Sequence, residues 1–191
     1  MSQLSYNEIT TGKVIVFRDE PYKVLSYKVF RMQQNKPVNV TKLKNLKNDK
    51  VVEYSFHVND KVIEAELEKR PVVYIYESKG TYMFHDAGNP GTRFSLDEDL
   101  IGPGIQFLKP KMEYESLVFN NEIIGIMIPI KMQFLVKEAP PAVKGNTAQG
   151  ATKNVTLETG TVITVPLFVH EGDTVEVNTE TGEYAGRITK A

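Results

Sequence analysis

The fold is decided near the end of the chain, where residues 153–188 read KNVTLETGTVITVPLFVHEGDTVEVNTETGEYAGRI. Residues 162–165 alternate with a period of two, and Ile163 and Val165 take the apolar side, as in a strand with one buried face. Pro166 has no N–H for a β-ladder and therefore closes this strand. Three glycines mark the turns around it: Gly160, Gly172 and Gly182. The stretch predicts the short strands of a small β-barrel.

The first part of the chain shows the same succession of hairpins. Turn-forming residues and a polar segment separate four apolar stretches, which predict strands over residues 14–17, 22–30, 38–46 and 51–56. The polar segment over residues 32–37 lies between the two longest strands. We therefore expect it to form a tip that projects into solvent.

The middle of the chain predicts a second, five-stranded barrel. Its clearest strands cover residues 72–76, 81–84, 114–119 and 123–128. The Asn120-Asn121 pair suits a tight hairpin turn with positive φ. The segment 96–108 is interrupted by Gly102-Pro-Gly104, and we expect one short helical turn over residues 96–100.

A third barrel begins after Pro129. Ile130, Met132, Phe134 and Val136 alternate with outward residues and predict its first strand. The Pro- and Gly-rich segment 139–150 is either a linker between domains or a long loop inside this barrel. We favour the loop, because the strand before it needs the later hairpins to bury its apolar side. The domains are then 1–65, 66–129 and 130–191.

These patterns make the chain all-β, with three small barrels. No segment of about ten residues has the 3.6-residue apolar period of a helix, which excludes parallel βαβ folds. The pattern favours an SH3-like (KOW-like) barrel for the first domain and OB-fold barrels for the second and third.

Composition narrows the class of protein further. The chain has 191 residues, 41% of them hydrophobic, and no cysteine, which excludes disulfides, thiolate metal sites and cysteine nucleophiles. It shows no apolar stretch of the roughly 18–20 residues that a membrane span needs, and no secretory signal at its start. We expect a cytoplasmic protein without a membrane partner.

The formal net charge of −1 hides an uneven distribution. Residues 1–63 hold eleven Lys and Arg against six acids, so the remainder is acidic. Within residues 23–50 eight basic residues face one acid, Asp49. Such a density is typical either of a surface that meets phosphates or of a solvated basic face.

The sequence offers no set of residues for catalysis. His57, His85 and His170 fall in three different predicted barrels and lack metal-ligand spacing. Gly102 and Gly104 lack the Lys-Ser/Thr of a phosphate-binding loop. The acids at every second position over 64–68 suit a solvated strand edge better than an acid–base pair. We predict no enzyme, no metal and no cofactor. A hydrolase and a structural assembly protein are the minor alternatives to this prediction outside the RNA-binding class.

Nucleic-acid binding is better supported, because Tyr22, Tyr27 and Phe30 interleave with basic residues in the first barrel. Adjacent strand residues point to opposite faces, so we assign the basic residues to RNA phosphates and these three aromatics to packing.

Several motifs resemble bacterial elongation factor P. They are Glu20-Pro-Tyr22, Lys42-Leu-Lys-Asn-Leu46, Glu66-Leu-Glu68, Tyr74-x-Tyr76, Val165-Pro-Leu-Phe-Val169 and Thr181-Gly-Glu-Tyr184. The resemblance implies the three barrels above and a monomeric, cytoplasmic translation factor that contacts both ribosomal subunits. It implies binding beside the peptidyl tRNA, between the peptidyl and exit sites, and stimulation of peptide-bond formation where consecutive prolines stall synthesis.

The tip departs from the family. The usual Pro-Gly-Lys-Gly carries a lysine that is enzymatically extended, or an arginine that is glycosylated, whereas this chain has Met32-Gln33-Gln34-Asn35. Gln34 takes the modified position, and an amide cannot receive these modifications. The resemblance implies tRNA acceptor-end contacts from Arg31, Gln33, Gln34, Asn35 and Lys36, and RNA phosphate contacts from Lys28, Lys42 and Lys44.

The resemblance also assigns residues of the third barrel. Gly145, Asn146 and Thr147 match a loop that approaches messenger RNA in the exit site, with Asn146 in place of an aspartate. Tyr184 and Arg187 match a contact with the small subunit and the tRNA, although Tyr184 fits barrel packing equally well. The alternative function is a paralogue that binds ribosome or RNA in a regulatory role without relieving proline stalls.

Overall fold

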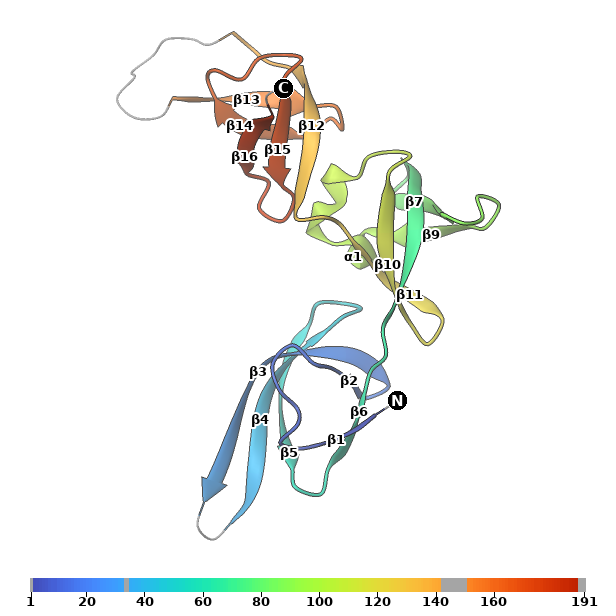
Figure 1. Ribbon diagram of the computed structural model, residues 1–191, viewed down its shortest axis with the longest axis vertical. Helices are drawn as coiled ribbons and strands as arrows, with labels where there is room; N and C mark the ends of the chain where they lie inside the picture. Colours follow the sequence, from blue (N-terminus) through green and yellow to red (C-terminus); the bar gives the residue numbers. More distant parts are fainter. Residues whose placement is uncertain (1, 33–34, 142–150, 189–191) are drawn as a thin grey trace. The chain divides into compact units, whose positions relative to one another are not determined.

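A computed structural model describes residues 2–32, 35–141 and 151–188 and shows three β-sheets with two short helical segments (Figure 1). The all-β fold class with three small barrels is confirmed. The chain groups into two compact units, residues 1–71 with 115–126 and residues 72–114 with 127–191. The boundaries near residues 65 and 129 stay a prediction.

The first sheet has six strands in the order β1-β6-β2-β3-β4-β5. They are β1 (Gln3–Ser5), β2 (Val14–Phe17), β3 (Glu20–Met32), β4 (Asn35–Asn45), β5 (Val51–His57) and β6 (Lys61–Glu64). Ile9, Ile15, Val24 and Leu43 have no exposed surface and form the centre of its core. The predicted tip was too long, because β4 begins at Asn35 and includes residues 35–37, and Asn35 pairs with Met32.

The second sheet follows the order β11-β10-β7-β8-β9. Its strands are β7 (Glu68–Ser78), β8 (Thr81–Asp86), β9 (Arg93–Asp97), β10 (Glu113–Phe119) and β11 (Glu122–Met127). Asn120 and Asn121 have φ of 50° and 65°, which confirms the predicted turn. The helical turn lies later than predicted: Leu96 is buried in β9, helix α1 is Glu98–Ile101 and a 3₁₀ turn, η1, covers Pro103–Phe107.

The third sheet has the order β14-β13-β12-β15-β16. Its strands are β12 (Lys131–Glu138), β13 (Thr152–Leu157), β14 (Val162–Pro166), β15 (Thr174–Asn178) and β16 (Tyr184–Ile188). The predicted alternation holds in β14, where Ile163 and Val165 are buried, and in β12 for Met132, Phe134 and Val136. It fails for Ile130, which precedes β12 and is 55% exposed because the ladder begins one residue later.

The predicted glycine turns of this barrel are also confirmed. Gly160, Gly172 and Gly182 have φ of 88°, 85° and 74°, in the left-handed region that a residue without a Cβ adopts easily.

The second and third sheets share one topology. In each, the first strand is central, the next two strands extend the sheet on one side, and the last two extend it on the other. This is the strand order of the five-stranded Greek-key barrel known as the OB-fold. The two edge strands of the third sheet are β14 and β16. They lie near each other, as shown by a hollow that residues of β14 and of the segment 181–184 line together.

Lys109, which follows η1, connects the last two barrels. Its Nζ lies 2.7 Å from the Glu158 carboxylate, 3.2 Å from the Gln133 carbonyl and 5.5 Å from the centre of the Phe134 ring. Phe107 of η1 contacts the same ring, with 5.6 Å between centroids. The Lys109 ammonium group, the Glu158 carboxylate and the two phenylalanine rings thus join η1 to β12 and to the turn after β13.

Glu158 should make stability depend on pH. Burial on its own raises the pKa of its carboxyl, but hydrogen bonds from Lys109 and the Leu135 N–H outweigh burial and hold the pKa below its ordinary 4.5. Stability from a lowered pKa is fully present above the unfolded value and is lost as the pH falls through the folded one. The wild type should therefore be more stable than Glu158→Gln near pH 7, and the difference should shrink by about pH 3 in urea unfolding. In a Lys109→Met background, the effect of Glu158→Gln on stability should decrease less between pH 7 and about pH 3. An equal decrease in both backgrounds would contradict the role of this ion pair.

Candidate nucleic-acid interface

The ladder between β3 and β4 contains an extra residue. Val24 pairs with Leu43 and Ser26 pairs with Lys42, so Leu25 has no partner and forms a β-bulge. Because side chains alternate along a strand, one unpaired residue reverses which positions face the core beyond it. Positions of β3 with even numbers face the core before the bulge, and positions with odd numbers do so after it.

This reversal gathers lysines on one face. Lys23 pairs with Lys44, and Lys28 pairs with Val40, two residues from Lys42 along β4; all of these positions lie on the side opposite the buried Val24 and Leu43. We call Lys23, Lys28, Lys42 and Lys44 the basic face. A strict alternation from Lys23 without the bulge would have pointed Lys28 toward the core.

Little of this charge is neutralised by neighbouring acids. Lys44 pairs with Asp49, with 2.7 Å between Nζ and Oδ1. Within the described residues, Lys23, Lys28 and Lys42 form no ion pair. The hairpin that carries them extends past the rest of its sheet in Figure 1. The basic face is therefore placed to attract an anionic partner.

The opposite side of the hairpin is anchored by buried polar residues. Asn39 is fully buried in β4, and its Nδ2 donates to the Tyr6 carbonyl at 2.6 Å and the Ile9 carbonyl at 2.9 Å. Thr41, 1% exposed, donates to the Tyr54 carbonyl at 2.9 Å. These bonds fix β4 to the segment before β2 and to β5, which holds the hairpin in place along its outer half.

Asn39→Ala should remove both bonds and leave two buried carbonyls without this donor. We expect the free energy of unfolding of the first barrel to fall by roughly 2–6 kcal/mol, at about 1–3 kcal/mol for each of the two orphaned groups. Asn59→Ala, on the exposed turn after β5, is the matched control and should change it by less than about 0.5 kcal/mol. Urea unfolding measures both, and equal effects would contradict the anchoring role of Asn39.

The assignment of the three aromatics to packing is confirmed only for Tyr22, which is 8% exposed. Tyr27 and Phe30 are 44% and 41% exposed, so packing was the wrong assignment for both. They lie on opposite faces: Tyr27 pairs with the buried Thr41, whereas Phe30 pairs with Val38 on the side of the basic face. Their odd spacing of three residues puts them on opposite faces, and the bulge decides that Phe30 is the one on the side of the basic face.

The predicted tip residues are described only in part. The backbones of Met32 and Asn35 pair, while Gln33 and Gln34 lie outside the described residues. Arg31 and Lys36 are exposed. Neither of them has an ion pair with any residue in the described ranges.

In the third barrel, Gly145, Asn146 and Thr147 also lie outside the described residues. Arg187 of β16 is held from two sides. Its Nη1 lies 3.6 Å from the Asp173 Oδ2, and its guanidinium lies 5.4 Å from the centre of the Phe168 ring.

Tyr184 lines the hollow next to β14, about 610 Å³ in volume. Burial raises the pKa of the Tyr184 hydroxyl above its usual value, although the nearby Arg187 opposes this shift. Tyr184 is half-buried, so it contributes to packing and still presents part of its ring.

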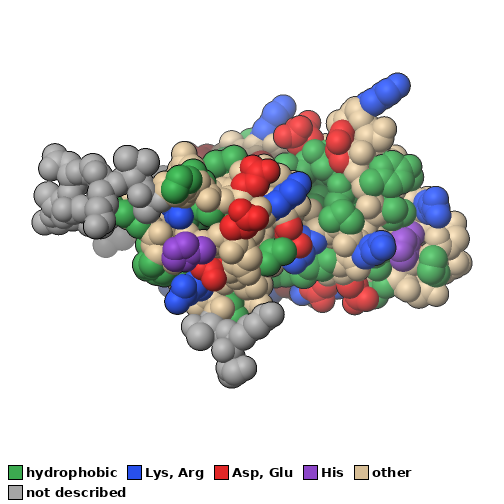
Figure 2. Space-filling view, turned by 90° about the horizontal axis from the view of Figure 1, so that it is seen from above, with side chains coloured by type: hydrophobic (Ala, Val, Ile, Leu, Met, Phe, Trp, Pro, Cys, Tyr) green, Lys and Arg blue, Asp and Glu red, His purple; other side chains and the backbone are tan. Residues whose placement is uncertain are grey.

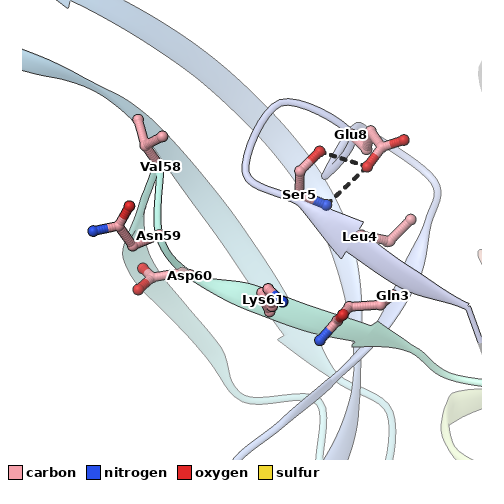
Figure 3. A pocket seen from close by; sticks show the side chains of 8 residues that line it. All are labelled: Gln3, Leu4, Ser5, Glu8, Val58, Asn59, Asp60 and Lys61. Carbon is pink, nitrogen blue, oxygen red and sulfur yellow. Dashed lines mark hydrogen bonds between the residues drawn. The ribbon is translucent and has the colours of Figure 1, made fainter.

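Elsewhere in the described residues, the features that bear on another candidate site are a second hollow, the surface charge, possible metal ligands and possible membrane helices. A hollow of about 370 Å³ beside β1 is lined by Ser5 and Glu8, which hydrogen-bond to each other, and by Asp60 on the opposite side (Figure 3). On the face drawn in Figure 2, acidic and basic side chains are interspersed. The described ranges contain no metal-binding group of three His, Cys, Asp or Glu. No helix in them is long and apolar enough to cross a membrane.

Two domain models of one known family match the two ends of the chain. The elongation factor P KOW-like domain matches residues 5–62, and the elongation factor P C-terminal domain matches residues 132–187. The elongation factor P of Moorella thermoacetica is 37% identical over 184 residues, which cover 96% of this chain and 99% of that protein. The chain belongs to the elongation factor P family. The factor from Thermodesulfovibrio yellowstonii is 33% identical and covers 97% of this chain and 98% of its own.

Family membership makes the chain a translation elongation factor, and it supports the prediction of a ribosome-binding protein rather than a typical enzyme. A solved structure titled eukaryotic translation initiation factor 5A from Methanococcus jannaschii has the same fold over part of the chain. Its TM-score is 0.55 at 14% identity, over 66% of this chain and 94% of that structure.

Proposed function

We propose that this protein binds the ribosome between the peptidyl and exit tRNA sites and stimulates peptide-bond formation where consecutive prolines stall synthesis. Kinship with elongation factor P over 96% of the chain carries this proposal. The projecting hairpin with its unpaired lysines supports it, because a surface that contacts RNA needs cations free to meet phosphates.

In this proposal the protein works by positioning. The ribosome supplies the chemistry, and the factor holds the acceptor end of the peptidyl tRNA productively, which lowers the entropic part of the barrier. Lys28, Lys42 and Lys44 contact RNA phosphates, and the tip places Gln34 at the acceptor end. The amide of Gln34 both donates and accepts hydrogen bonds without any modification. Arg31, Gln33, Asn35 and Lys36 support it.

The third barrel is proposed to contact the small subunit and the tRNA through Tyr184 and Arg187. The fixed guanidinium of Arg187 supports this assignment, because a planar fork held in place suits a phosphate oxygen pair. Gly145, Asn146 and Thr147 are assigned to messenger RNA in the exit site. The protein is proposed to act as a cytoplasmic monomer.

Translation in vitro of a reporter with three consecutive prolines tests this function. The wild type should give more full-length product than buffer, while a reporter without the prolines should respond little. Gln34→Ala should reduce the stimulation, since it removes the amide contact at the tip. Wild type equal to buffer would refute stall relief, and Gln34→Ala equal to wild type would show that the amide is dispensable. Intact mass measurement shows in parallel whether any residue is modified.

The alternative, a paralogue that binds the ribosome in a regulatory role, shares the binding and lacks the stimulation. Binding itself is tested by co-sedimentation with ribosomes at increasing salt. Each neutralised phosphate adds roughly 0.7–0.9 to the slope of log affinity against log salt, so Lys28→Gln should lower the slope by about this amount. Lys44→Gln is the comparison within the basic face and should lower the slope less, because Asp49 already pairs with Lys44. A slope that neither variant changes would contradict the phosphate contacts.

A further inference from the structure

Phe30 is a large ring with no place in the core. It is 41% exposed and pairs with Val38 on the face opposite the fully buried Asn39. Its neighbour Val29, not Phe30, pairs with Asn39 on the core side. The pairing register therefore places the Phe30 ring outside the core, where it does not pack against the buried residues of the barrel.

A cation accompanies the ring. The Lys28 Nζ lies over Phe30, 5.0 Å from the ring centre. Lys28 and Arg31 are exposed and have no acidic partner among the described residues. An exposed ring next to unpaired cations is the combination that binds unpaired nucleotides, because the ring stacks on a base while the cations meet the phosphates on either side of it.

We propose that Phe30 is a stacking platform for an unpaired base at the acceptor end of the tRNA, with Lys28 as the contact to the adjoining phosphate. This inference rests on the proposed function, which brings this end of the hairpin to the acceptor end. Phe30 lies two residues before the Met32–Asn35 pair, the last of the ladder. A base inside a duplex has both faces covered by its neighbours, so only unpaired nucleotides offer a face to the ring.

The platform gives a physical reason why an unmodified tip suffices. Base–aromatic stacking needs no enzyme to install it and is tolerant of sequence. It adds a second contact to the one that the proposed function assigns to the short, neutral amide of Gln34. The ring thereby shares the positioning of the acceptor end with the tip.

The test measures affinity of the full chain for ribosomes that carry a peptidyl-site tRNA, either intact or trimmed of its unpaired 3′ nucleotides. Phe30→Leu and Phe30→Thr remove the ring, and Phe30→Tyr keeps it. Tyr27→Leu is the matched control, since Tyr27 is similarly exposed on the other face of the same hairpin. With intact tRNA, loss of the ring should weaken binding on the order of tenfold, while Phe30→Tyr and Tyr27→Leu stay near wild type. With trimmed tRNA, wild type and ring-less variants should bind equally.

The outcomes separate this inference from the proposed function. A wild type that fails to bind ribosomes at all would refute the proposed function. A wild type that binds while Phe30→Leu and Phe30→Thr bind equally well to intact tRNA would refute the stacking alone. Equal weakening with intact and trimmed tRNA would also overturn it, because the stacked base would then belong to ribosomal RNA.

Discussion

The unpaired Leu25 in the ladder between β3 and β4 is the constraint on which the hairpin depends. A strand has two faces, and a single extra residue exchanges them for every position beyond it. The core side past the bulge carries Asn39, whose two hydrogen bonds fix β4 to the segment before β2. The solvent side carries Lys28 and Phe30. With the opposite parity Lys28 would lie on the side of Thr41 and Asn39, away from the other three lysines of the basic face.

Features set by neighbouring residues could be predicted from the sequence. The alternation in β14 and the turn at Asn120-Asn121 follow from a two-residue period and from residues that tolerate positive φ, and both appear as expected. Features set by pairing partners could not. The position of α1, the start of β4 at Asn35 and the exposure of Ile130 depend on where a ladder begins or ends, and that is decided by strands distant in sequence.

The residues of the candidate interface show the same distinction between features set by neighbouring residues and features set by strand partners. A count of charges over residues 23–50 locates the interface, because eight basic residues against one acid are a density expected of a surface that meets phosphates. The count cannot tell which lysines share a face, nor that Asp49 neutralises Lys44 and leaves Lys28 unpaired. It also cannot separate Tyr22, which packs in the core, from Phe30, which does not. These distinctions need the register.

The two ends of the chain present their cations in physically different ways. Lys28 is a flexible point charge on a projecting strand, so its attraction acts over a distance and weakens as salt is added. Arg187 is held by the Asp173 carboxylate and the Phe168 ring, which leaves less side-chain entropy to lose on binding but tempers its charge. The first arrangement favours capture of a polyanion, and the second favours a defined orientation once it is captured. The proposed function, which works by positioning, needs both arrangements, and it assigns the positioning to the groups with the least freedom: the Arg187 guanidinium in the third barrel and the Phe30 ring in the first.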